Sequence, residues 1–208
     1  MLINLKKLQI KYKLKLETII HVGAHTCKEY STYNRCGASR IFWIDANREL
    51  VKRNISKLPQ PQNIMIEAVV SEFDGETVEF NIFSNGQASS ILKLDLCKKL
   101  FPGIRYVDSI VKSTKKLDTL YKNYCNDANI DLLNLDIQGA ELLALKGFST
   151  NLHKVNTIYT EINTEHLYKD GALLKDLDEY LSQFNFTRVE TEMWKDHPWG
   201  DAFYLKNA

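Results

Sequence analysis

Three acidic residues stand where strand-like runs of the sequence end. Each follows or closes an apolar, β-branched run, and these acids are Asp45, Asp136 and Glu161. Because the carboxyl ends of parallel strands meet at one edge of a sheet, we expect these carboxylates to border one site. A carboxylate at such an edge can bind ribose hydroxyls or take the proton of a reacting hydroxyl. The sequence therefore predicts a site that combines a nucleoside-bearing cofactor with acid–base chemistry.

A small-residue turn precedes the first of these acids at the spacing of a cofactor-binding unit. A strand-like run ends in Gly23-Ala24-His25, a helix-like segment follows, and a second strand-like run ends at Asp45. The acid lies about 20 residues beyond the turn, as this unit requires. Gly23 would let the backbone approach the ligand, and Asp45 would bind both ribose hydroxyls. A βαβ unit with an incidental loop glycine and a capping acid is the alternative.

The residues after the turn distinguish between cofactors. A dinucleotide site uses three glycines so that a pyrophosphate can lie on the helix N-terminus. In this chain the corresponding places hold His25, Cys27 and Lys28. A bulky, mostly polar turn suits a ligand without a pyrophosphate, such as S-adenosylmethionine (SAM). The turn therefore favours methyl transfer over hydride transfer.

Apolar runs and amphipathic stretches alternate along the rest of the chain, which predicts a parallel sheet covered by helices on both faces. Strands are expected at residues 18–22, 40–44, 63–70, 105–117, 130–136 and 155–162. Residues 77–83 alternate with a period of two and predict an antiparallel excursion. Residues 187–193 and 202–205 predict a terminal antiparallel hairpin. The expected fold class is α/β, the Rossmann-like, doubly wound, mostly parallel seven-stranded sheet of class I methyltransferases.

Composition indicates one domain and makes several partners unexpected. The 208 residues include 27 basic and 26 acidic side chains, a net charge of +1, so no nucleic-acid partner is expected. Lysines and apolar residues alternate in residues 1–16, which predicts a basic amphipathic lead-in to a single domain at residues 17–208. An arm that touches membrane or RNA is the alternative for this segment. No apolar stretch approaches the ~20 residues that span a bilayer.

The cysteines and histidines give further expectations. The four cysteines form no CxxC pair, and no secretory leader precedes them, which favours reduced thiols in a cytoplasmic protein. The five histidines have no ligand-like spacing with the cysteines, so a zinc site is not indicated. The oligomeric state is left open.

Eight short segments resemble a known family in their order and spacing. They are IHVGAH at 20–25, WIDAN at 43–47, EAVVS at 67–71, ASSIL at 88–92, LDTL at 117–120, LDIQGAE at 135–141, TEIN at 160–163 and WGDA at 199–202. Together they resemble the FkbM-type SAM-dependent methyltransferases over residues 19–205. Two positions depart from that family's pattern. Cys27 stands where the family commonly has glycine, and we expect its side chain to crowd the methionine end of the SAM site. Asp45 replaces the usual glutamate but still suits a ribose diol.

The resemblance and the strand pattern together imply a set of cofactor-binding residues. These are Gly23, Ala24, His25, Asp45, Ala46, Asn47, Glu67, Ala68, Ser90 and Asp136. For Ser90 and its neighbour Ser89, the alternative is turn chemistry after the preceding Asn-Gly pair.

Methyl transfer to a hydroxyl needs a positioned oxygen and a proton acceptor. Asp136 is the best-placed candidate, and Glu161 and His166 are expected beside the acceptor, with His166 as another possible base. The structural alternatives are an N-cap role for Asp136 and an exposed position for His166. The same three side chains would suit a divalent cation, which the sequence permits but does not favour.

Acceptor binding is predicted for Glu141 and for an aromatic and polar rim near the C-terminus. The rim consists of Trp194, His197, Trp199 and Asp201. Proteins often bind sugars by stacking an aromatic ring while polar groups take the hydroxyls. The alternatives are that the helix dipole alone favours Glu141, and that the rim is one buried tryptophan and a turn.

The expected function is transfer of a methyl group from SAM to a hydroxyl of a sugar in a glycan, glycolipid or glycosylated metabolite. The sugar is implied by the acceptors usual in the family. Two alternatives stay open: a non-catalytic SAM- or nucleoside-binding module of a larger glycan-processing assembly, and O-methylation of a polyketide-like small molecule. An RNA substrate is disfavoured by the near-neutral charge.

Overall fold

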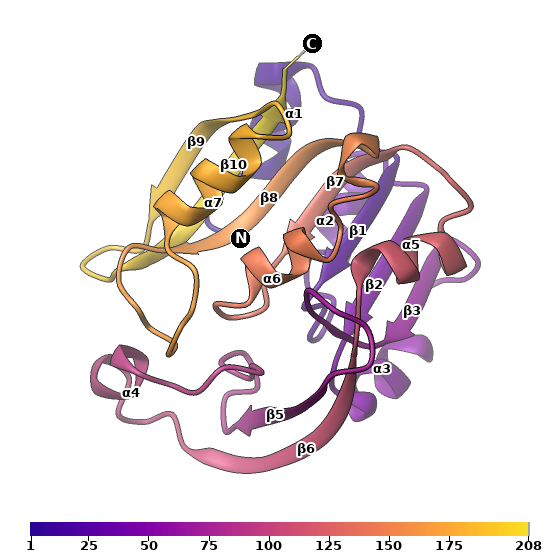
Figure 1. Ribbon diagram of the computed structural model, residues 1–208. Coiled ribbons are helices and arrows are strands. Elements are labelled where there is room, and N and C mark those ends of the chain that lie inside the picture. The colour runs from indigo at the N-terminus through magenta and orange to yellow at the C-terminus, as the bar shows by residue number, and fades with distance from the viewer. Residues whose placement is uncertain (208) are drawn as a thin grey trace.

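The computed structural model describes residues 1–207 and is built around one seven-stranded sheet (Figure 1). Its strands are β1 Thr18–Val22, β2 Arg40–Asp45, β3 Asn63–Glu67, β7 Ile130–Leu135, β8 Val155–Asn163, β9 Phe186–Met193 and β10 Trp199–Lys206. They lie in the order β3-β2-β1-β7-β8-β10-β9. All neighbours pair in parallel except β10, which is antiparallel to both β8 and β9. The predicted sheet, with its closing antiparallel hairpin, is confirmed.

The central strands are apolar because helices cover both faces of the sheet. All six residues of β7 are buried, and so are the last five of β2 and the last four of β1. Leucine, isoleucine and valine dominate these strands, as expected for a parallel sheet that is buried on both sides.

One face of the sheet, the near face in Figure 1, carries three helices. They are α5 Leu117–Tyr124, α6 Glu141–Lys146 and α7 Leu174–Ser182. Leu120, Leu145 and Leu181, one from each helix, are buried in the same apolar core as Ile20 and Leu133 of the sheet. These helices therefore fix the β7–α6 connection, which carries Asp136, against the sheet.

The opposite face carries the helices α1 Leu5–Tyr12 and α2 Tyr30–Arg35. Leu8 of α1 and Tyr33 of α2 pack in a second core with Trp43 of β2. Leu5 is also buried in this core, so the segment predicted as a separate lead-in is part of the domain. Ile10, one of the apolar residues of the predicted amphipathic lead-in, is instead 70% exposed.

A second, three-stranded sheet interrupts the α/β order. It consists of β4 Val69–Val70, β6 Tyr106–Lys115 and β5 Thr77–Phe83, in that spatial order. β5 and β6 pair antiparallel, which confirms the predicted excursion. The chain between them carries the short helix α4 Leu96–Leu100, and the ribbon of β5 and β6 lies below the main sheet in Figure 1.

The single strand predicted for residues 63–70 is split in the structure. Only β3 pairs with β2, whereas β4 leaves the main sheet and pairs with β6. Ala68 lies at the break, where its N–H donates to the Asp45 carbonyl (3.1 Å). Both halves are rich in buried, β-branched residues, so their sequence pattern does not reveal the change of partner. The break places Ala68 in the wall of a cavity.

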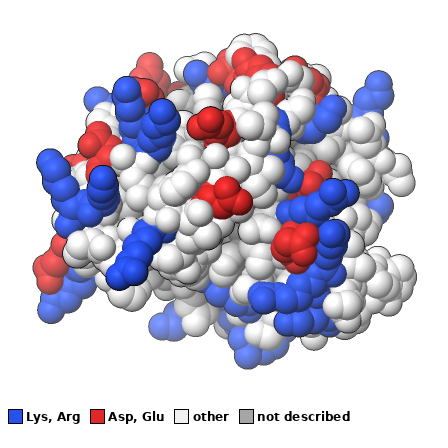
Figure 2. All heavy atoms as spheres, turned by 90° about the horizontal axis from the view of Figure 1, so that it is seen from below, with Lys and Arg blue, Asp and Glu red and all other residues white. Residues whose placement is uncertain are grey.

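Within residues 1–207, no helix has both the length and the apolar character that crossing a bilayer requires. Basic side chains lie in several groups on the face in Figure 2, with acidic side chains among them. Next to β2 and β3, α3 Arg48–Ile55 contributes the basic residues Arg48, Lys52 and Arg53.

Candidate active site

A cavity of about 550 Å³ lies at the carboxyl ends of β1, β2 and β7. Its volume falls in the range of small-molecule sites. Most of the predicted cofactor residues line it: Gly23, Ala24, His25, Asp45, Ala46, Asn47, Ala68, Ser90 and Asp136. The opposite wall is largely apolar and comes from α4, the loops around it and the N-terminal segment, with Leu2, Phe101, Ile104 and Leu167 among its residues.

Gly23 is required by the packing of the β1 turn against the end of β7. Its φ is +88°, and a Cβ added there would lie 1.8 Å from the Asp136 carbonyl oxygen. The N–H groups of Gly23 and Ala24 both donate to the Ile44 carbonyl (2.9 and 3.0 Å). The glycine therefore lets three strand ends converge, a role in addition to the predicted close approach of the ligand.

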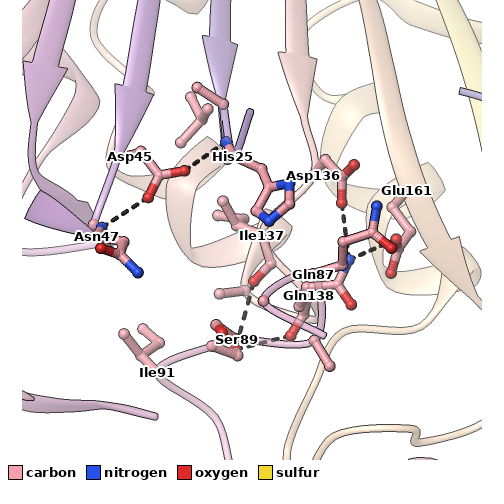
Figure 3. Close-up of a pocket in the computed structure, with 18 of the residues that line it drawn as sticks. His25, Asp45, Asn47, Gln87, Ser89, Ile91, Asp136, Ile137, Gln138 and Glu161 are labelled. Atoms are coloured by element: carbon pink, nitrogen blue, oxygen red, sulfur yellow. Dashed lines mark hydrogen bonds between the residues drawn. The ribbon is translucent and has the colours of Figure 1, made fainter. Parts of the chain in front are cut away.

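Asp45 is fixed at the cavity by two backbone hydrogen bonds (Figure 3). Its carboxylate accepts from the N–H of His25 (2.6 Å) and of Asn47 (2.7 Å). Burial raises the pKa of Asp45, and the two amide hydrogen bonds oppose that rise. Each carboxylate oxygen can accept a further hydrogen bond. Asp45 can therefore bind a pair of hydroxyls without moving.

Asn47 and Ser90 hold the chain around the cavity. The Asn47 side chain caps α3 by accepting from the N–H of Glu49 (3.0 Å). The Ser90 hydroxyl donates to the Gln138 carbonyl (2.9 Å) and accepts from the Leu92 N–H (3.1 Å). Ser90 thus joins the loop after β5 to the loop after β7. The alternative for Ser90, a role only in the local turn, does not account for this link.

The His25 ring lies under the loop that follows β5. A Cβ added at Gly86 would lie 2.8 Å from the His25 Nε2 atom, so Gly86 leaves room for the ring. Figure 3 shows this ring between Asp45 and Asp136 in the cavity. His25 therefore contacts both walls of the site.

Asp136 and Glu161 are brought together by a residue that the sequence reasoning missed. The Gln138 side-chain Nε2 donates to Asp136 Oδ1 and to Glu161 Oε2, at 2.8 Å each (Figure 3). Burial, and then the charge of Asp136, raises the pKa of Glu161 well above its usual range. Asp136 makes no N-cap bond to α6, so its structural alternative is wrong. The sequence did offer a sign of this role, because Gln138 lies between Asp136 and Glu141 in the motif at 135–141.

Four of the predicted residues do not line the cavity, and three of them have partners elsewhere. Glu67 lies outside it, in ion pairs with Lys112 (2.6 Å) and Arg48 (3.3 Å). His166 is exposed, and its Nδ1 atom is 3.0 Å from the Gly171 carbonyl. His197 stacks on Phe101, with ring centroids 5.1 Å apart, and is not in the cavity lining. Their positions therefore do not support the roles predicted for them in adenine, proton and acceptor binding, which stay predictions.

Glu141 is the fourth exception and is a structural residue. It is buried below the cavity, where its Oε1 accepts from the N–H of Ile137 (3.0 Å) and of Gly139 (3.2 Å). These bonds hold the loop that carries Asp136 and Gln138. The predicted acceptor-binding role is wrong because the side chain points into the loop and away from solvent. Burial raises the pKa of Glu141 to about 7.

The buried position of Glu141 predicts a pH-dependent stability. Its pKa in the folded protein, about 7, exceeds the ~4.3 of an unfolded chain, so the folded state binds the extra proton. The stabilisation is complete below the unfolded pKa and is lost as the pH rises towards 7. Glu141→Gln should therefore flatten the fall in unfolding free energy between pH 5 and 7 by about 1 kcal/mol per pH unit. Urea unfolding at pH 5, 6 and 7 measures this, and equal slopes in both proteins would contradict it.

The aromatic rim forms the other end of the cavity. The rings of Trp194 and Trp199 are stacked, 5.3 Å apart and inclined by 9°, and both line the cavity. Trp194 is 47% exposed, so one broad ring surface is open to solvent. The alternative of one buried tryptophan is therefore wrong.

Asp201 has a different partner from the one predicted. Its carboxylate accepts from the Tyr159 hydroxyl and from the Leu2 N–H. The Ile3 N–H donates to the Tyr159 oxygen (3.0 Å), so these two side chains hold the N-terminal segment beside the cavity. Met1 and Leu2 line the cavity as a result. The sequence did not reveal this wall, because its contacts join residues more than 150 positions apart.

Cys27 leaves the cavity open. Its φ is +53°, a left-handed conformation that glycine adopts more easily. The side chain is buried on the far side of the turn, with its sulfur 3.9 Å from that of Met65. The expected crowding of the methionine end is therefore wrong, and the departure from the family pattern affects the core instead.

The three side chains considered for a divalent cation are not brought together, since His166 lies apart from Asp136 and Glu161. Residues 1–207 contain no cluster of three or more histidine, cysteine or acidic side chains arranged to hold a metal ion.

The strand order, with a nucleoside-sized cavity at the carboxyl ends of β1 and β2, defines a class I methyltransferase fold. TrmK of M. capricolum, solved with S-adenosylhomocysteine (SAH), matches 100% of this chain and 70% of its own, with a TM-score of 0.54 and 11% identity. The FkbM methyltransferase of Methylobacillus flagellatus KT matches 91% of this chain and 43% of its own, with a TM-score of 0.54 and 15% identity.

Sequence comparison identifies the family. The model of the methyltransferase FkbM domain matches residues 21–188. The 2-O-methyltransferase NoeI of Sinorhizobium fredii is 32% identical over 84 residues, which are 39% of this chain and 33% of that protein. The matched part thus spans about a third of that relative's length. The chain belongs to the FkbM family of SAM-dependent methyltransferases, as its motifs predicted.

Proposed function

We propose that the protein transfers a methyl group from SAM to a hydroxyl of a sugar. The observation that carries the proposal is one cavity with Asp45 at one end and the pair Asp136 and Glu161, beside a stacked tryptophan rim, at the other. The matching relative NoeI is itself named a 2-O-methyltransferase, which supports transfer to oxygen.

The residues of the first end fit SAM. The carboxylate of Asp45 lines the cavity with lone pairs left for two ribose hydroxyls. Gly23 and Ala24 present backbone to the ligand, and Ala68 offers a small apolar wall for the adenine. The turn holds no run of glycines for a pyrophosphate.

The second end supplies a proton acceptor and a hydrogen-bond donor. Bound SAM would supply a methyl group that is activated by its positive sulfur. Asp136 would take the proton of the acceptor hydroxyl as the new carbon–oxygen bond forms and the carbon–sulfur bond breaks, which yields a methyl ether and SAH. Glu161, whose pKa is raised well above the usual range by burial and by Asp136, would stay protonated and hold the acceptor oxygen. Two carboxyl groups with different environments can thus take different roles.

The tryptophan rim and the apolar wall support a sugar on an apolar carrier. A pyranose ring can stack on the open face of Trp194 while its hydroxyls approach Asp136.

We also propose a cytoplasmic location, because all four cysteines are free, buried thiols.

An acceptor screen tests this function. The protein is incubated with SAM and either hexose and deoxyhexose glycosides or non-sugar alcohols of polyketide type. Mass spectrometry then measures SAH and the added methyl group. We expect SAH only with sugars. Methylation of the non-sugar alcohols alone would assign the other small-molecule class, and SAM binding without SAH from any acceptor would favour the non-catalytic module.

A further inference from the structure

The Gln138 side chain lies between the two carboxyl groups of the active site. Its Nε2 is 2.8 Å from Asp136 Oδ1 and 2.8 Å from Glu161 Oε2. The two carboxyls come from neighbouring strand ends, and Figure 3 shows the amide reaching both of them. One amide nitrogen carries two N–H groups, so each carboxyl receives one of them.

The other end of the amide is fixed as well. The Tyr168 hydroxyl donates to Gln138 Oε1 at 2.8 Å. Tyr168 is buried, and burial raises its pKa well above the usual range, so the hydroxyl keeps the proton that it donates. A flipped amide would place its oxygen against oxygens of both carboxyl groups, and Asp136 would then lose its donor. The orientation with Nε2 towards the acids gives each carboxyl group a donor, and it gives the Tyr168 hydroxyl an acceptor in addition to the Ala88 carbonyl (3.2 Å).

The backbone at Gln138 is built to hold this side chain. Its φ is +59°, and the next residue, Gly139, has a φ of +93°. A Cβ on Gly139 would lie 3.1 Å from the Cβ of Tyr168, so the loop packs directly on the residue that orients the amide. The Glu141 carboxyl group accepts a hydrogen bond from the Gly139 N–H (3.2 Å). A side chain in a left-handed conformation that is fixed from three sides is typical of a functional constraint.

We propose that Gln138 is a positioning residue, which holds Asp136 and Glu161 apart and keeps one oxygen of each free for the acceptor. This inference rests on the proposed function, because it assigns how the two carboxyls of that site are held. The amide is a neutral donor with two N–H groups, so it can bridge two acids without adding a charge to the site. Gln138 acts through these carboxyls and need not touch the methyl group.

The electrostatic surroundings favour such a bridge. Many of the groups that face Asp136 and Glu161 are acidic or neutral: Glu141 of α6, Asp201 of β10, Tyr168, Cys97 of α4, His21 of β1 and Tyr33 of α2. Met1, His25 and Lys28 line the same cavity, but within residues 1–207 the side-chain hydrogen bonds to these two carboxyls come from Gln138. Burial lowers the pKa of His21 to about 4, so it is a neutral ring near neutral pH. The two N–H groups of Gln138 therefore stabilise charge on the pair by direct hydrogen bonds.

Substitution of Gln138 should therefore shift the titration midpoint of Glu161 in a direction that can be measured. Hydrogen bonds to a charged form favour that form, so their loss raises a carboxyl pKa. Gln138→Met keeps the length and removes both donors, and we expect the titration midpoint of Glu161 to rise by about one pH unit. Tyr168→Phe should cause a smaller rise, since the amide stays but is no longer oriented. A matched control is Gln87→Met, because Gln87 also lines the cavity but bridges no carboxyls.

The experiment is a pH titration of the side-chain carboxyl resonances by carbon-13 NMR in ligand-free protein, with Glu161→Gln to assign the signal. The expected result is a raised midpoint in Gln138→Met and an unchanged one in Gln87→Met. An equal midpoint in wild type, Gln138→Met and Gln87→Met would overturn the inference. If Gln138→Met does not fold, Gln138→Asn, which is too short to reach both acids, must show the rise instead. Calorimetry with SAM on the same samples tests the proposed function separately, because the carboxyl titration needs no ligand.

Discussion

Asp45→Ala should reduce the affinity for SAM by about a hundredfold or more. Hydrogen bonds to a charged group contribute ~1.5–3 kcal/mol each, and two of them to a ribose diol account for at least this loss. The Asp45 carboxylate is held at the cavity by the N–H groups of His25 and Asn47. Alanine removes both the ligand contacts and this fixed geometry. Titration calorimetry with SAM measures the effect.

The control for this substitution is Asp45→Glu, which places the residue usual in the family at this position. Glutamate keeps the carboxylate and should retain most of the affinity. Thermal melts show whether the loss in Asp45→Ala reflects unfolding, since alanine leaves the amides of His25 and Asn47 without their acceptor. A folded Asp45→Ala protein that binds SAM like wild type would remove the ribose role.

Asp136→Asn should lower turnover by about 10²–10⁴-fold and leave the SAM affinity near that of wild type. Asparagine keeps an oxygen that can accept from Gln138 Nε2, so the loop should hold its shape. It cannot take the proton of the acceptor hydroxyl. Steady-state SAH production with the acceptor found in the screen measures turnover, and calorimetry measures SAM affinity.

Asp131→Asn is the matched control for Asp136→Asn. Asp131 is a buried acid near the start of β7, the strand that Asp136 follows. Its carboxylate accepts hydrogen bonds from the N–H groups of Glu17 (2.9 Å) and Thr18 (3.0 Å). Its substitution should lower stability without changing the turnover of the folded protein. If Asp136→Asn keeps wild-type turnover, the proton acceptor is another group.

The sequence predicted the sheet and one end of the site well because both depend on local patterns. The buried runs of β1, β2 and β7 are continuous, and each ends at the residue where the chain meets the cavity. Asp45 and Asp136 follow from that rule alone. Residues that line the cavity were therefore predictable at the ends of β1, β2 and β7, but not at the end of β3, where Glu67 lies outside it.

The rest of the site depends on features that strand patterns do not carry. Gln138 bonds both acids from a left-handed backbone conformation, which its residue type does not predict. His166 and Glu67 lie at the expected places along the chain, but hydrogen bonding and ion pairing hold them away from the cavity. Leu2 lines the site through a hydrogen bond to Asp201, at the far end of the chain.

Titration of the wild-type protein with SAM and, separately, with SAH tests most directly whether this cavity is the cofactor site of a methyltransferase. We predict micromolar binding of both, since Asp45 and the turn at Gly23 line the cavity and would contact parts that the two molecules share. Absence of binding by either ligand to folded protein would contradict the proposed function and leave the cavity to a different nucleoside or to a non-catalytic role.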